Sequence, residues 1–399
     1  MEGYAFNGVN NFRMDDFNVL DAAQRLIDEL QKEYDRMTTI NVVVAGKTGS
    51  GKSTLINNVF REKMAETGTG MPITQEINKI EKEGFPLRVY DTPGLELGGQ
   101  NSTETLVGDI QDLIEKSIQS EDPNQAIHCV WYCINTQSSR IEQTEMDFIK
   151  TLVNKTKNYN VPVIIILTQA YPKKKVAAMR EAIQDMYLPV HEIVPVLAED
   201  VEMDDDYIIK AYGLDKLVEV INYVLPTRVK DTFVAIQTAS LDLKKKKAQQ
   251  IVKLAAAITG AVPIPFSDAA ILVPTQISML VKITSSFGLS VEKAAMVGVI
   301  SATIGTTGTT ILGKSAVSNL LKFIPGAGTV IGGAISGATA AALTASLGEA
   351  YIAIMIKVTK GEMEISDLAT SKGQMELKNE FERQMKVKRD KNGEALEKQ

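Results

Sequence analysis

The feature that most constrains this chain is residues 46–53, GKTGSGKS, which match the phosphate-binding P-loop pattern G-x-x-x-x-G-K-[ST] at every fixed position. The loop follows an apolar run, residues 40–45, in which Asn41 is the only polar residue. It precedes residues 54–60, which have the composition of a helix. Because strand, glycine-rich turn and helix in this order are the setting that the motif needs, the segment predicts a site for the phosphates of a nucleotide.

Each residue type in this loop suits phosphate binding. Glycines let the backbone turn until successive N–H groups point at one anion, and the helix start adds unpaired donors and a positive dipole end. We expect Lys52 to place its charge at the outer phosphates and the Ser53 hydroxyl to coordinate Mg²⁺. The residues expected to contact the nucleotide here are Gly46, Lys47, Thr48, Gly49, Ser50, Gly51, Lys52, Ser53 and Thr54.

Composition indicates a folded protein of two or three domains. The chain has 399 residues, 44% of them hydrophobic, and a formal net charge of -6, which argues against general nucleic-acid binding. Cys129 and Cys133 stand four residues apart in one expected strand, roughly 13 Å from each other, too far for a disulfide. They are expected to be core thiols in a reducing compartment. Residues 1–15 contain no apolar signal core, so export is not expected.

Apolar periodicity divides the chain into four parts. Residues 1–37 contain an amphipathic helix, 38–228 alternate strands with helices, 229–360 are expected to form helices joined by Pro/Gly turns, and 361–399 form a charged helical tail. The expected fold is an α/β domain with a mostly parallel six-stranded sheet flanked by helices, plus an all-α C-terminal domain that the N-terminal helix joins. The expected strands are 40–45, 77–82, 87–91, 127–135, 161–168 and 193–197.

A second motif, Asp91-Thr92-Pro93-Gly94, follows the third expected strand, about forty residues after the P-loop. A carboxylate such as Asp91 at a strand end can hold the ligand shell of Mg²⁺. The N–H of Gly94 is then placed to meet a γ-phosphate. D-x-x-G alone is a weak indication, but together with the P-loop it favours a GTPase over most ATPases.

With both motifs in place, residues 38–226 resemble the translation-factor-related GTPases, in particular their Era-like and septin-like branches. The resemblance implies GTP and GDP as ligands, Mg²⁺ as cofactor and hydrolysis of GTP to GDP and phosphate. In that family a switch-I threonine coordinates Mg²⁺ and senses the γ-phosphate. Thr74 is the candidate here, with Thr69 as its competitor and an ordinary loop threonine as the open alternative. The residues expected to hold the metal are Ser53, Thr74 and Asp91.

One departure from the family concerns hydrolysis. Leu95 stands where Ras-like enzymes carry a glutamine that orients water, and leucine cannot hydrogen-bond a water molecule. We therefore expect slow intrinsic turnover, or a catalytic group supplied from elsewhere. Families with this replacement often complete their sites by dimerising across the nucleotide, and Arg140 could act in trans; a surface arginine beside a helix is the open alternative. The expected catalytic residues are Lys52, Thr74, Gly94 and Arg140.

A second departure concerns the base. The guanine-reading motif N-K-x-D is degraded to Thr168-Gln169-Ala170-Tyr171, so its specificity aspartate is missing. Gln169 is expected to lie along the base and Tyr171 to stack on it. In Leu197-Ala198-Glu199, the N–H of Ala198 is expected to meet the guanine oxygen. The expected base-binding residues are Thr168, Gln169 and Ala198, and the preference for guanine rests on the resemblance.

The second half also shows a resemblance. Segments 254–258, 262–268, 274–279 and 323–328 are similar to an uncharacterised helical domain that follows Era-like G domains in bacteria. This implies architecture without chemistry. The uncharged runs 294–313 and 323–348 leave two alternatives, a buried soluble bundle or membrane insertion. G-x-x-x-G spacings and the basic run Lys244–Lys247, which could meet anionic headgroups, are compatible with insertion. The many Gly, Ser, Thr and Ala residues of both runs favour the buried bundle, and a solvated helix end is the open alternative for the lysines.

Three functions stay open. The leading one is a GTP-dependent switch whose slow hydrolysis a dimer or partner stimulates, coupled to the helical effector domain. The second is a nucleotide-driven membrane scaffold in which hydrolysis resets assembly. The third is ribosome assembly, which the acidic pI disfavours. Expected partners are a guanine nucleotide, a second copy across the nucleotide, a protein and, in the second function, a membrane. The expected location is cytoplasmic, with attachment to or insertion at the inner face of a membrane as the alternative.

Overall fold

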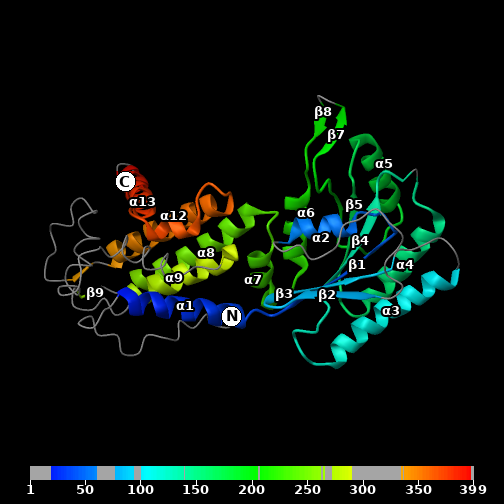
Figure 1. Cartoon of the computed structure of the whole chain (residues 1–399), viewed down its shortest axis with the longest axis horizontal. Helices are drawn as coiled ribbons and strands as arrows, with labels where there is room; N and C mark the ends of the chain where they lie inside the picture. The colour runs from blue at the N-terminus through cyan, green and yellow to red at the C-terminus, as the bar shows by residue number, and fades with distance from the viewer. Residues whose placement is uncertain are drawn as a thin grey trace. The chain divides into compact units, whose positions relative to one another are not determined.

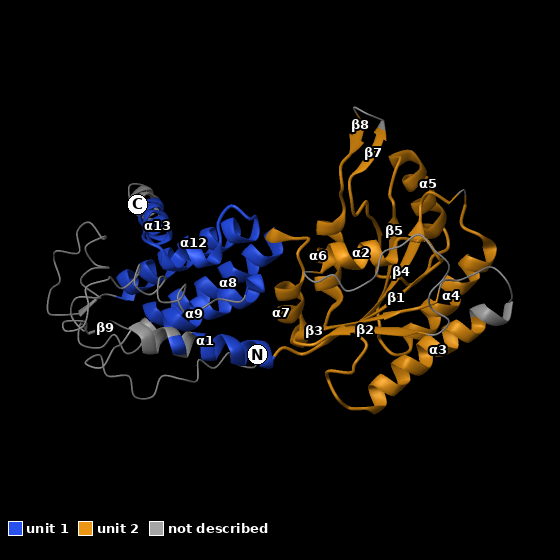
Figure 2. Cartoon of the chain, viewed as in Figure 1, with its two compact units in different colours: residues 1–36, 242–399 blue, residues 37–241 orange. Residues whose placement is uncertain are grey.

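The computed structural model describes residues 19–60, 77–93, 100–138, 140–204, 207–261, 264–265, 272–289, 334–335 and 337–396. The chain divides into two compact units, residues 37–241 and residues 1–36 together with 242–399 (Figure 2). The N-terminal helix α1 (Val19–Asp35) thus belongs to the helical unit, as the sequence predicts. Residues 37–241 are called the sheet unit below.

The sheet unit is built on the six expected strands (Figure 1), and each observed end lies no more than two residues from its predicted position. In the sheet their order is β2-β3-β1-β4-β5-β6, with β2 antiparallel to β3 and every other neighbouring pair parallel. The predicted fold class is therefore confirmed. The strands are β1 (Ile40–Gly46), β2 (Asn78–Lys82), β3 (Phe85–Asp91), β4 (Cys129–Asn135), β5 (Val163–Thr168) and β6 (Glu192–Pro195).

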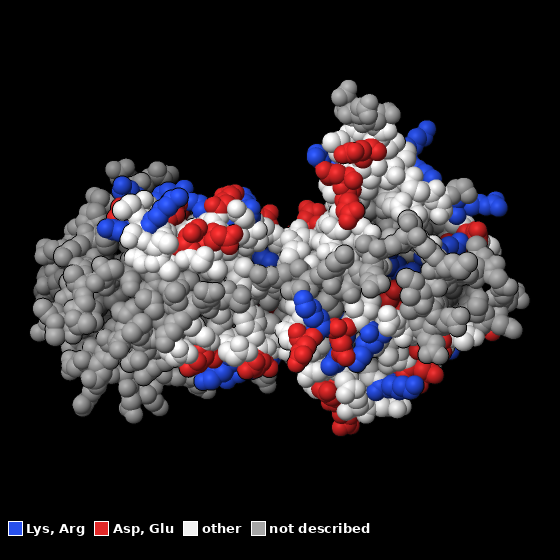
Figure 3. All heavy atoms as spheres, viewed as in Figure 1, with Lys and Arg blue, Asp and Glu red and all other residues white. Residues whose placement is uncertain are grey.

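Helices flank this sheet, and a hairpin projects from the unit. The helices are α2 (Lys52–Val59), α3 (Gln100–Gln119), α4 (Gln143–Lys157), α5 (Lys173–Gln184), α6 (Leu214–Val224) and α7 (Thr227–Ile236). The hairpin pairs β7 (Val201–Asp204) with β8 (Tyr207–Ile209). Sequence analysis missed it because its strands are short, partly acidic and exposed, so they show no apolar alternation. In the face shown in Figure 3, acidic side chains gather over this hairpin, whereas elsewhere on the described surface both signs are interspersed.

The core of the sheet unit explains the continuous apolar runs of its central strands. β1, β4 and β5 are buried along nearly their whole length, since helices cover both faces of a parallel sheet. Phe60, just after α2, stacks on Trp131 of β4 at 5.7 Å and meets the edge of Phe233 of α7 at 6.4 Å. Cys129 and Cys133 are both buried and unbridged, as predicted, and burial raises the pKa of each thiol to about 12.

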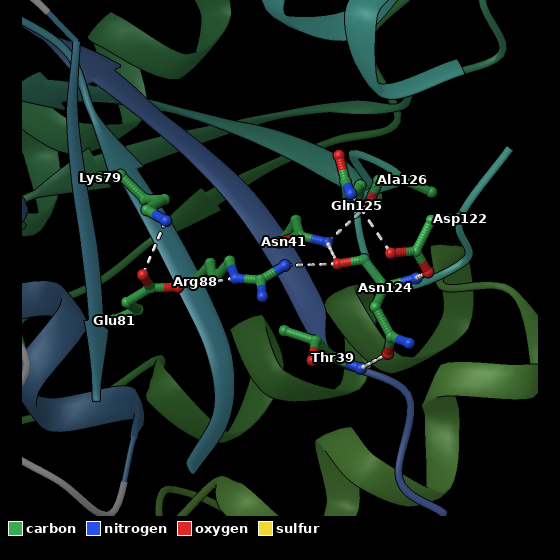
Figure 4. Close-up of polar contacts among 9 residues, drawn as sticks. All are labelled: Thr39, Asn41, Lys79, Glu81, Arg88, Asp122, Asn124, Gln125 and Ala126. Atoms are coloured by element: carbon green, nitrogen blue, oxygen red, sulfur yellow. Dashed lines mark hydrogen bonds and ion pairs between the residues drawn. The ribbon is translucent and has the colours of Figure 1, made fainter. Parts of the chain in front are cut away.

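A polar cluster joins β1, β2 and β3 to the loop before β4 (Figure 4). Buried Asn41 donates through Nδ2 to the carbonyls of Asn124 and Ala126, each at 2.9 Å. Arg88 donates to the same Asn124 carbonyl at 2.7 Å and pairs with Glu81 at 2.8 Å. The one polar residue in the first apolar run is thus retained because both its amide hydrogens bind loop carbonyls.

The helical unit contains α1, α8 (Leu241–Gly260), α9 (Leu272–Phe287), α12 (Gly337–Thr359) and α13 (Ser371–Leu396). α12 packs on α9 and α13, and α1 packs on α9 (Figure 1). Tyr34 of α1 donates to the carbonyl of Leu289 at 2.8 Å. A 3-10 helix (Ile365–Ala369) precedes α13, and β9 (Ile264–Pro265) pairs antiparallel with β10 (Ala334–Ile335).

Two sequence observations bearing on membranes can be compared with this unit. Among the described helices, α12 alone is long and apolar enough to cross a bilayer, and 61% of its most apolar window is buried inside the protein. The run 294–313 and residues 323–333 lie outside the described residues. The basic run at 244–247 is not one continuous charged surface, because Lys244 is buried and donates to the carbonyls of Ser286 and Phe287 at the end of α9.

Candidate nucleotide site

The P-loop joins β1 to α2 at the carboxyl end of the parallel sheet. Its glycines Gly46, Gly49 and Gly51 have φ angles of 146°, 74° and 79°, which side chains adopt at a cost. At Gly46 a Cβ would lie 2.3 Å from the carbonyl oxygen of Cys133 on the neighbouring strand. Glycine is therefore required there both by backbone conformation and by space.

The ends of the neighbouring strands hold the loop in place. Asn135, the last residue of β4, donates through Nδ2 to the carbonyl of Gly49 at 3.2 Å. Thr168, the last residue of β5, places its hydroxyl 2.6 Å from the carbonyl of Ser50. Sequence analysis predicted Thr168 at the site but missed Asn135, which a polar residue ending a predicted central strand could have indicated. These bonds occupy loop carbonyls and fix the path of the backbone.

Lys52 reaches back over the loop from the first turn of α2. Its Nζ donates to the carbonyls of Gly46 at 3.1 Å and Lys47 at 3.3 Å. Burial raises the pKa of Asp91, and the nearby charge of Lys52 partly opposes that rise. Oδ1 of Asp91 is buried with no hydrogen-bond partner among the described residues. The unpaired oxygen of Asp91 and the hydroxyl of the P-loop serine Ser53 are hard oxygen ligands of the kind that Mg²⁺ prefers, so these residues fit the implied metal.

The side chain of the P-loop residue Lys47 pairs with two glutamates at the start of α4. Its Nζ lies 2.9 Å from a carboxylate oxygen of Glu145 on α4 and 3.4 Å from one of Glu142. Glu145 is buried and also accepts a hydrogen bond from Tyr132 at 3.2 Å. The side chain of Lys47 therefore neutralises a buried carboxylate, and only its backbone is left for a phosphate. No local pattern in the sequence indicates this pairing.

A cavity of about 220 Å³ opens beside Gly51 and Thr54. The base-binding residues predicted from separate segments meet in its wall, together with neighbours that sequence analysis did not assign; six of these lining residues are Thr168, Gln169, Tyr171, Leu197, Ala198 and Glu199. Gln169 has a φ of 46°, and its carbonyl accepts from the Gln137 side chain at 2.8 Å. The same Gln137 amide donates to the carbonyl of Tyr171, so it holds the segment 169–171 that follows β5.

The structure does not bring every expected residue to this site. Arg140 lies exposed before α4 and forms no ion pair within the part of the chain that the structure describes. Thr69, Thr74, Gly94 and Leu95 lie outside the described residues. The roles expected for the switch threonine, for the glycine of D-x-x-G and for the missing glutamine therefore stay predictions.

Comparison with known proteins agrees with this geometry. Residues 41–169 match the family model described as "50S ribosome-binding GTPase", and residues 229–374 match a "Domain of unknown function (DUF697)". The chain is similar to human septin-12, with 25% identity over 204 residues that are 46% of this chain and 56% of septin-12. It is also 34% identical to translocase of chloroplast 108 from Physcomitrium patens, over 29% of this chain and 12% of that protein.

Among solved structures, the chain is similar to Aquifex aeolicus Era bound to GDP.AlF4-, with 22% identity, a TM-score of 0.33, and coverage of 56% of this chain and 68% of that one. The chain thus spans a little over half of septin-12 and a small part of the translocase. The segment that matches the GTPase family model is thus followed by a helical segment that matches a domain of unknown function.

Proposed function

We propose that this protein binds GTP with Mg²⁺ and hydrolyses it slowly, and that the nucleotide controls the helical unit. The observation that carries the proposal is the joining of two half-sites at one sheet edge. The P-loop, with Lys52 and the unpaired oxygen of Asp91, forms the phosphate half. The cavity beside Gly51 forms the base half. Their common position at the carboxyl ends of the strands is where open α/β sheets bind ligands.

Each part of the site has its own role in binding and hydrolysing the triphosphate. Backbone N–H groups of the loop and the start of α2 bind the phosphates. Lys52 exchanges its two carbonyl partners for phosphate oxygens and stabilises the charge that spreads over the transferring group. Ser53 and Asp91 would hold Mg²⁺, which when bound supplies further positive charge at those oxygens. Leu95 offers no hydrogen bond to the attacking water, so turnover is expected to be slow until another group assists.

Calorimetry with GTP, with and without Mg²⁺, tests the binding. Lys52→Ala is expected to weaken GTP binding at least tenfold, roughly what loss of a charged hydrogen bond costs. Asp91→Asn is expected to remove most of the dependence on Mg²⁺. Lys150→Ala, on the exposed face of α4, is the matched control and should leave affinity unchanged. A folded wild-type protein that retains no purine triphosphate would refute the proposal.

The source of the assisting group is a separate question. We propose a second copy of the chain, with Arg140 as the residue it contributes, because Arg140 is exposed and close in sequence to the acids that hold Lys47. Turnover per molecule should then rise with protein concentration, and Arg140→Ala should abolish the rise. Lys150→Ala again serves as control. Turnover that is independent of concentration, or unaffected by Arg140→Ala, would remove this residue from the mechanism.

One observation keeps a membrane role as a second candidate. α12 has the length and apolarity of a spanning helix, although most of that apolar window is buried in the bundle. If nucleotide state releases the bundle, liposomes of anionic lipid should carry the protein on flotation with a GTP analogue and not with GDP. Protein that stays unbound in both states would eliminate this candidate and leave the switch proposal intact.

A further inference from the structure

Two acidic residues line the cavity beside the P-loop, although the degraded base-reading motif contains no carboxylate. In that motif the specificity aspartate is replaced by Tyr171. Glu199 and Asp200, in the segment between β6 and β7, both line the cavity. Guanine offers two donors side by side, N1–H and N2–H, and a carboxylate can accept from both. Two acidic side chains in this wall therefore raise the question of which one reads the base.

Their hydrogen bonds distinguish the two carboxylates. Asp200 has both oxygens engaged, Oδ2 with Lys210 at 2.8 Å and Oδ1 with the N–H of Ala211 at 2.7 Å. These bonds hold the pKa of Asp200 below its usual value. Asp200 thus binds the residues that directly follow β8, and both of its carboxylate oxygens already have a hydrogen-bond donor.

Glu199 has one oxygen engaged and no cation partner among the described residues. Its Oε1 accepts from Nδ2 of Asn58 on α2 at 3.1 Å. Asn58 also donates to the carbonyl of Thr54, a residue in the cavity wall, at 2.8 Å. The carboxylate of Glu199 is therefore tethered to the helix that begins at the P-loop, which fixes the base half of the site relative to the phosphate half.

We propose that Glu199 is the specificity-determining residue for guanine. Its carboxylate accepts from N1–H and N2–H, while the adjacent N–H of Ala198 donates to O6. Adenine presents an unprotonated N1 at that position, so a carboxylate there faces a lone pair and disfavours ATP. The cavity, at about 220 Å³, is smaller than the roughly 300–1,000 Å³ typical of drug-sized ligands and suits a single base. This assignment rests on the proposed GTP binding.

Nucleotide competition with the full-length protein tests the assignment. Wild-type protein should prefer GTP to ATP, and ITP, which lacks the N2 amino group, should bind roughly tenfold more weakly than GTP. Glu199→Ala should lower GTP affinity roughly 10- to 100-fold and leave ATP affinity within about threefold. Glu199→Gln should favour XTP over GTP, because the amide donates to the xanthine carbonyl that replaces the amino group.

Two further variants separate this role from structural damage. Asp200→Asn is the matched control, since it changes the neighbouring acid in the same way and should leave the order of the nucleotides unchanged. Asn58→Ala should weaken GTP binding by a smaller factor than Glu199→Ala, because it only releases the tether. Circular dichroism and thermal unfolding establish that each variant is folded.

The outcomes can be told apart. Wild-type protein that binds no nucleotide overturns the proposed function and this assignment with it. Wild-type protein that binds GTP through Lys52, while folded Glu199 variants keep an undiminished preference for GTP over ATP and ITP, overturns the assignment alone. Equal wild-type affinity for ATP and GTP does the same. Reversal of the preference from GTP to XTP in Glu199→Gln, with Asp200→Asn unchanged, supports it.

Discussion

The sheet unit and the helical unit place their polar residues in opposite ways. In the sheet unit, central strands are apolar along their length, and polar groups gather where strands end, as Asn135 and Thr168 do. In the helical unit, polar groups lie inside the core. There Thr259 and the Gln276 amide both meet the hydroxyl of Thr344, at 3.1 and 3.3 Å.

This difference follows from how the backbone N–H and C=O groups find hydrogen-bond partners in a sheet and in a helical bundle. In a parallel sheet, backbone N–H and C=O groups pair between neighbouring strands, and unpaired groups remain only where strands end. Ligand-binding residues therefore gather at the carboxyl ends of the strands. Helices satisfy themselves internally and can approach closely where small residues meet, which leaves room for short polar pairs between them. In the sheet unit, polar groups at the strand ends therefore hold the P-loop of the candidate nucleotide site, whereas in the helical unit they pair with one another between helices.

The largest effect is expected from Gly46→Ala, at the carboxyl edge of the sheet. The new Cβ would lie 2.3 Å from a backbone oxygen that cannot move without shifting β4, at a φ of 146°. We expect a loss of about 3 kcal/mol in unfolding free energy and loss of GTP binding. Gly49→Ala is the control: it meets nothing within 4 Å, so it should cost only about 1 kcal/mol of backbone strain.

Urea unfolding and calorimetry measure both effects. If Gly46→Ala were no more damaging than Gly49→Ala, the loop would not approach β4 closely enough to bring an added Cβ within 2.3 Å of the Cys133 carbonyl oxygen, and the packing of the P-loop on the sheet edge would be refuted.

The second prediction concerns pH, which should act on the sheet unit through His128. Burial first, and the positive charge of Arg228 second, lower the pKa of His128 to about 4, and its Nδ1 accepts the N–H of Asn41 at 3.1 Å. The unfolded chain takes up this proton near pH 6.5 and the folded chain near pH 4. Stability is thus complete above pH 6.5 and falls by about 3 kcal/mol as the pH drops from 6.5 to 4.

His128→Asn keeps an acceptor for Asn41 and removes the titration, so its stability should depend less on pH in that window. His191→Asn, at the exposed second histidine of the chain, is the control. Chemical unfolding followed at several pH values checks the slope. Equal slopes in wild type and His128→Asn would contradict the buried, neutral imidazole.

Features of the sheet unit that depend on a local sequence pattern were predictable, and features that depend on tertiary contacts were not. The six strands and the P-loop were predictable because each depends on a local pattern, a buried apolar run or a motif of eight residues. The hairpin β7–β8 was missed because its exposed, acidic strands carry no such pattern.

Partners distant in sequence were also beyond prediction. The pairing of Lys47 with Glu145 and the tether from Asn58 to Glu199 join residues 98 and 141 positions apart, and only the fold brings them together. Composition changes near residue 229, where the match to the domain of unknown function begins, whereas the sheet unit continues to residue 241 and includes α7, whose Phe233 meets Phe60.

In the helical unit, helices approach one another closely through side chains at Gly348. At Gly348 of α12 a Cβ would lie 2.4 Å from Cγ2 of Val252 on α8 and 3.0 Å from the sulfur of Met279 on α9. Gly348→Ala should cost about 2 kcal/mol by overpacking three helices. Gly108→Ala, on α3 with nothing within 4 Å, should instead stabilise by about 0.5–1 kcal/mol.

Thermal unfolding compares the two variants. Combining Gly348→Ala with Val252→Ala removes the colliding methyl groups and should recover part of the loss. A stable Gly348→Ala protein would show that α8 and α12 do not pack at this distance.

The smallest effect is expected from the polar core of the helical unit itself. Tyr351 and Thr284 are both buried, with their hydroxyl oxygens 2.8 Å apart, and Thr284 already donates to the carbonyl of Leu280. Tyr351 therefore donates to Thr284. Tyr351→Phe leaves one acceptor unsatisfied and should cost about 1 kcal/mol. Tyr187→Phe, at a tyrosine that is 90% exposed in the sheet unit, should cost nothing measurable. Equal stabilities of the two variants in urea unfolding would mean that the buried hydroxyl pair adds nothing to the free energy of unfolding. The two units would then differ in the positions of their polar atoms but not in what those atoms contribute to stability.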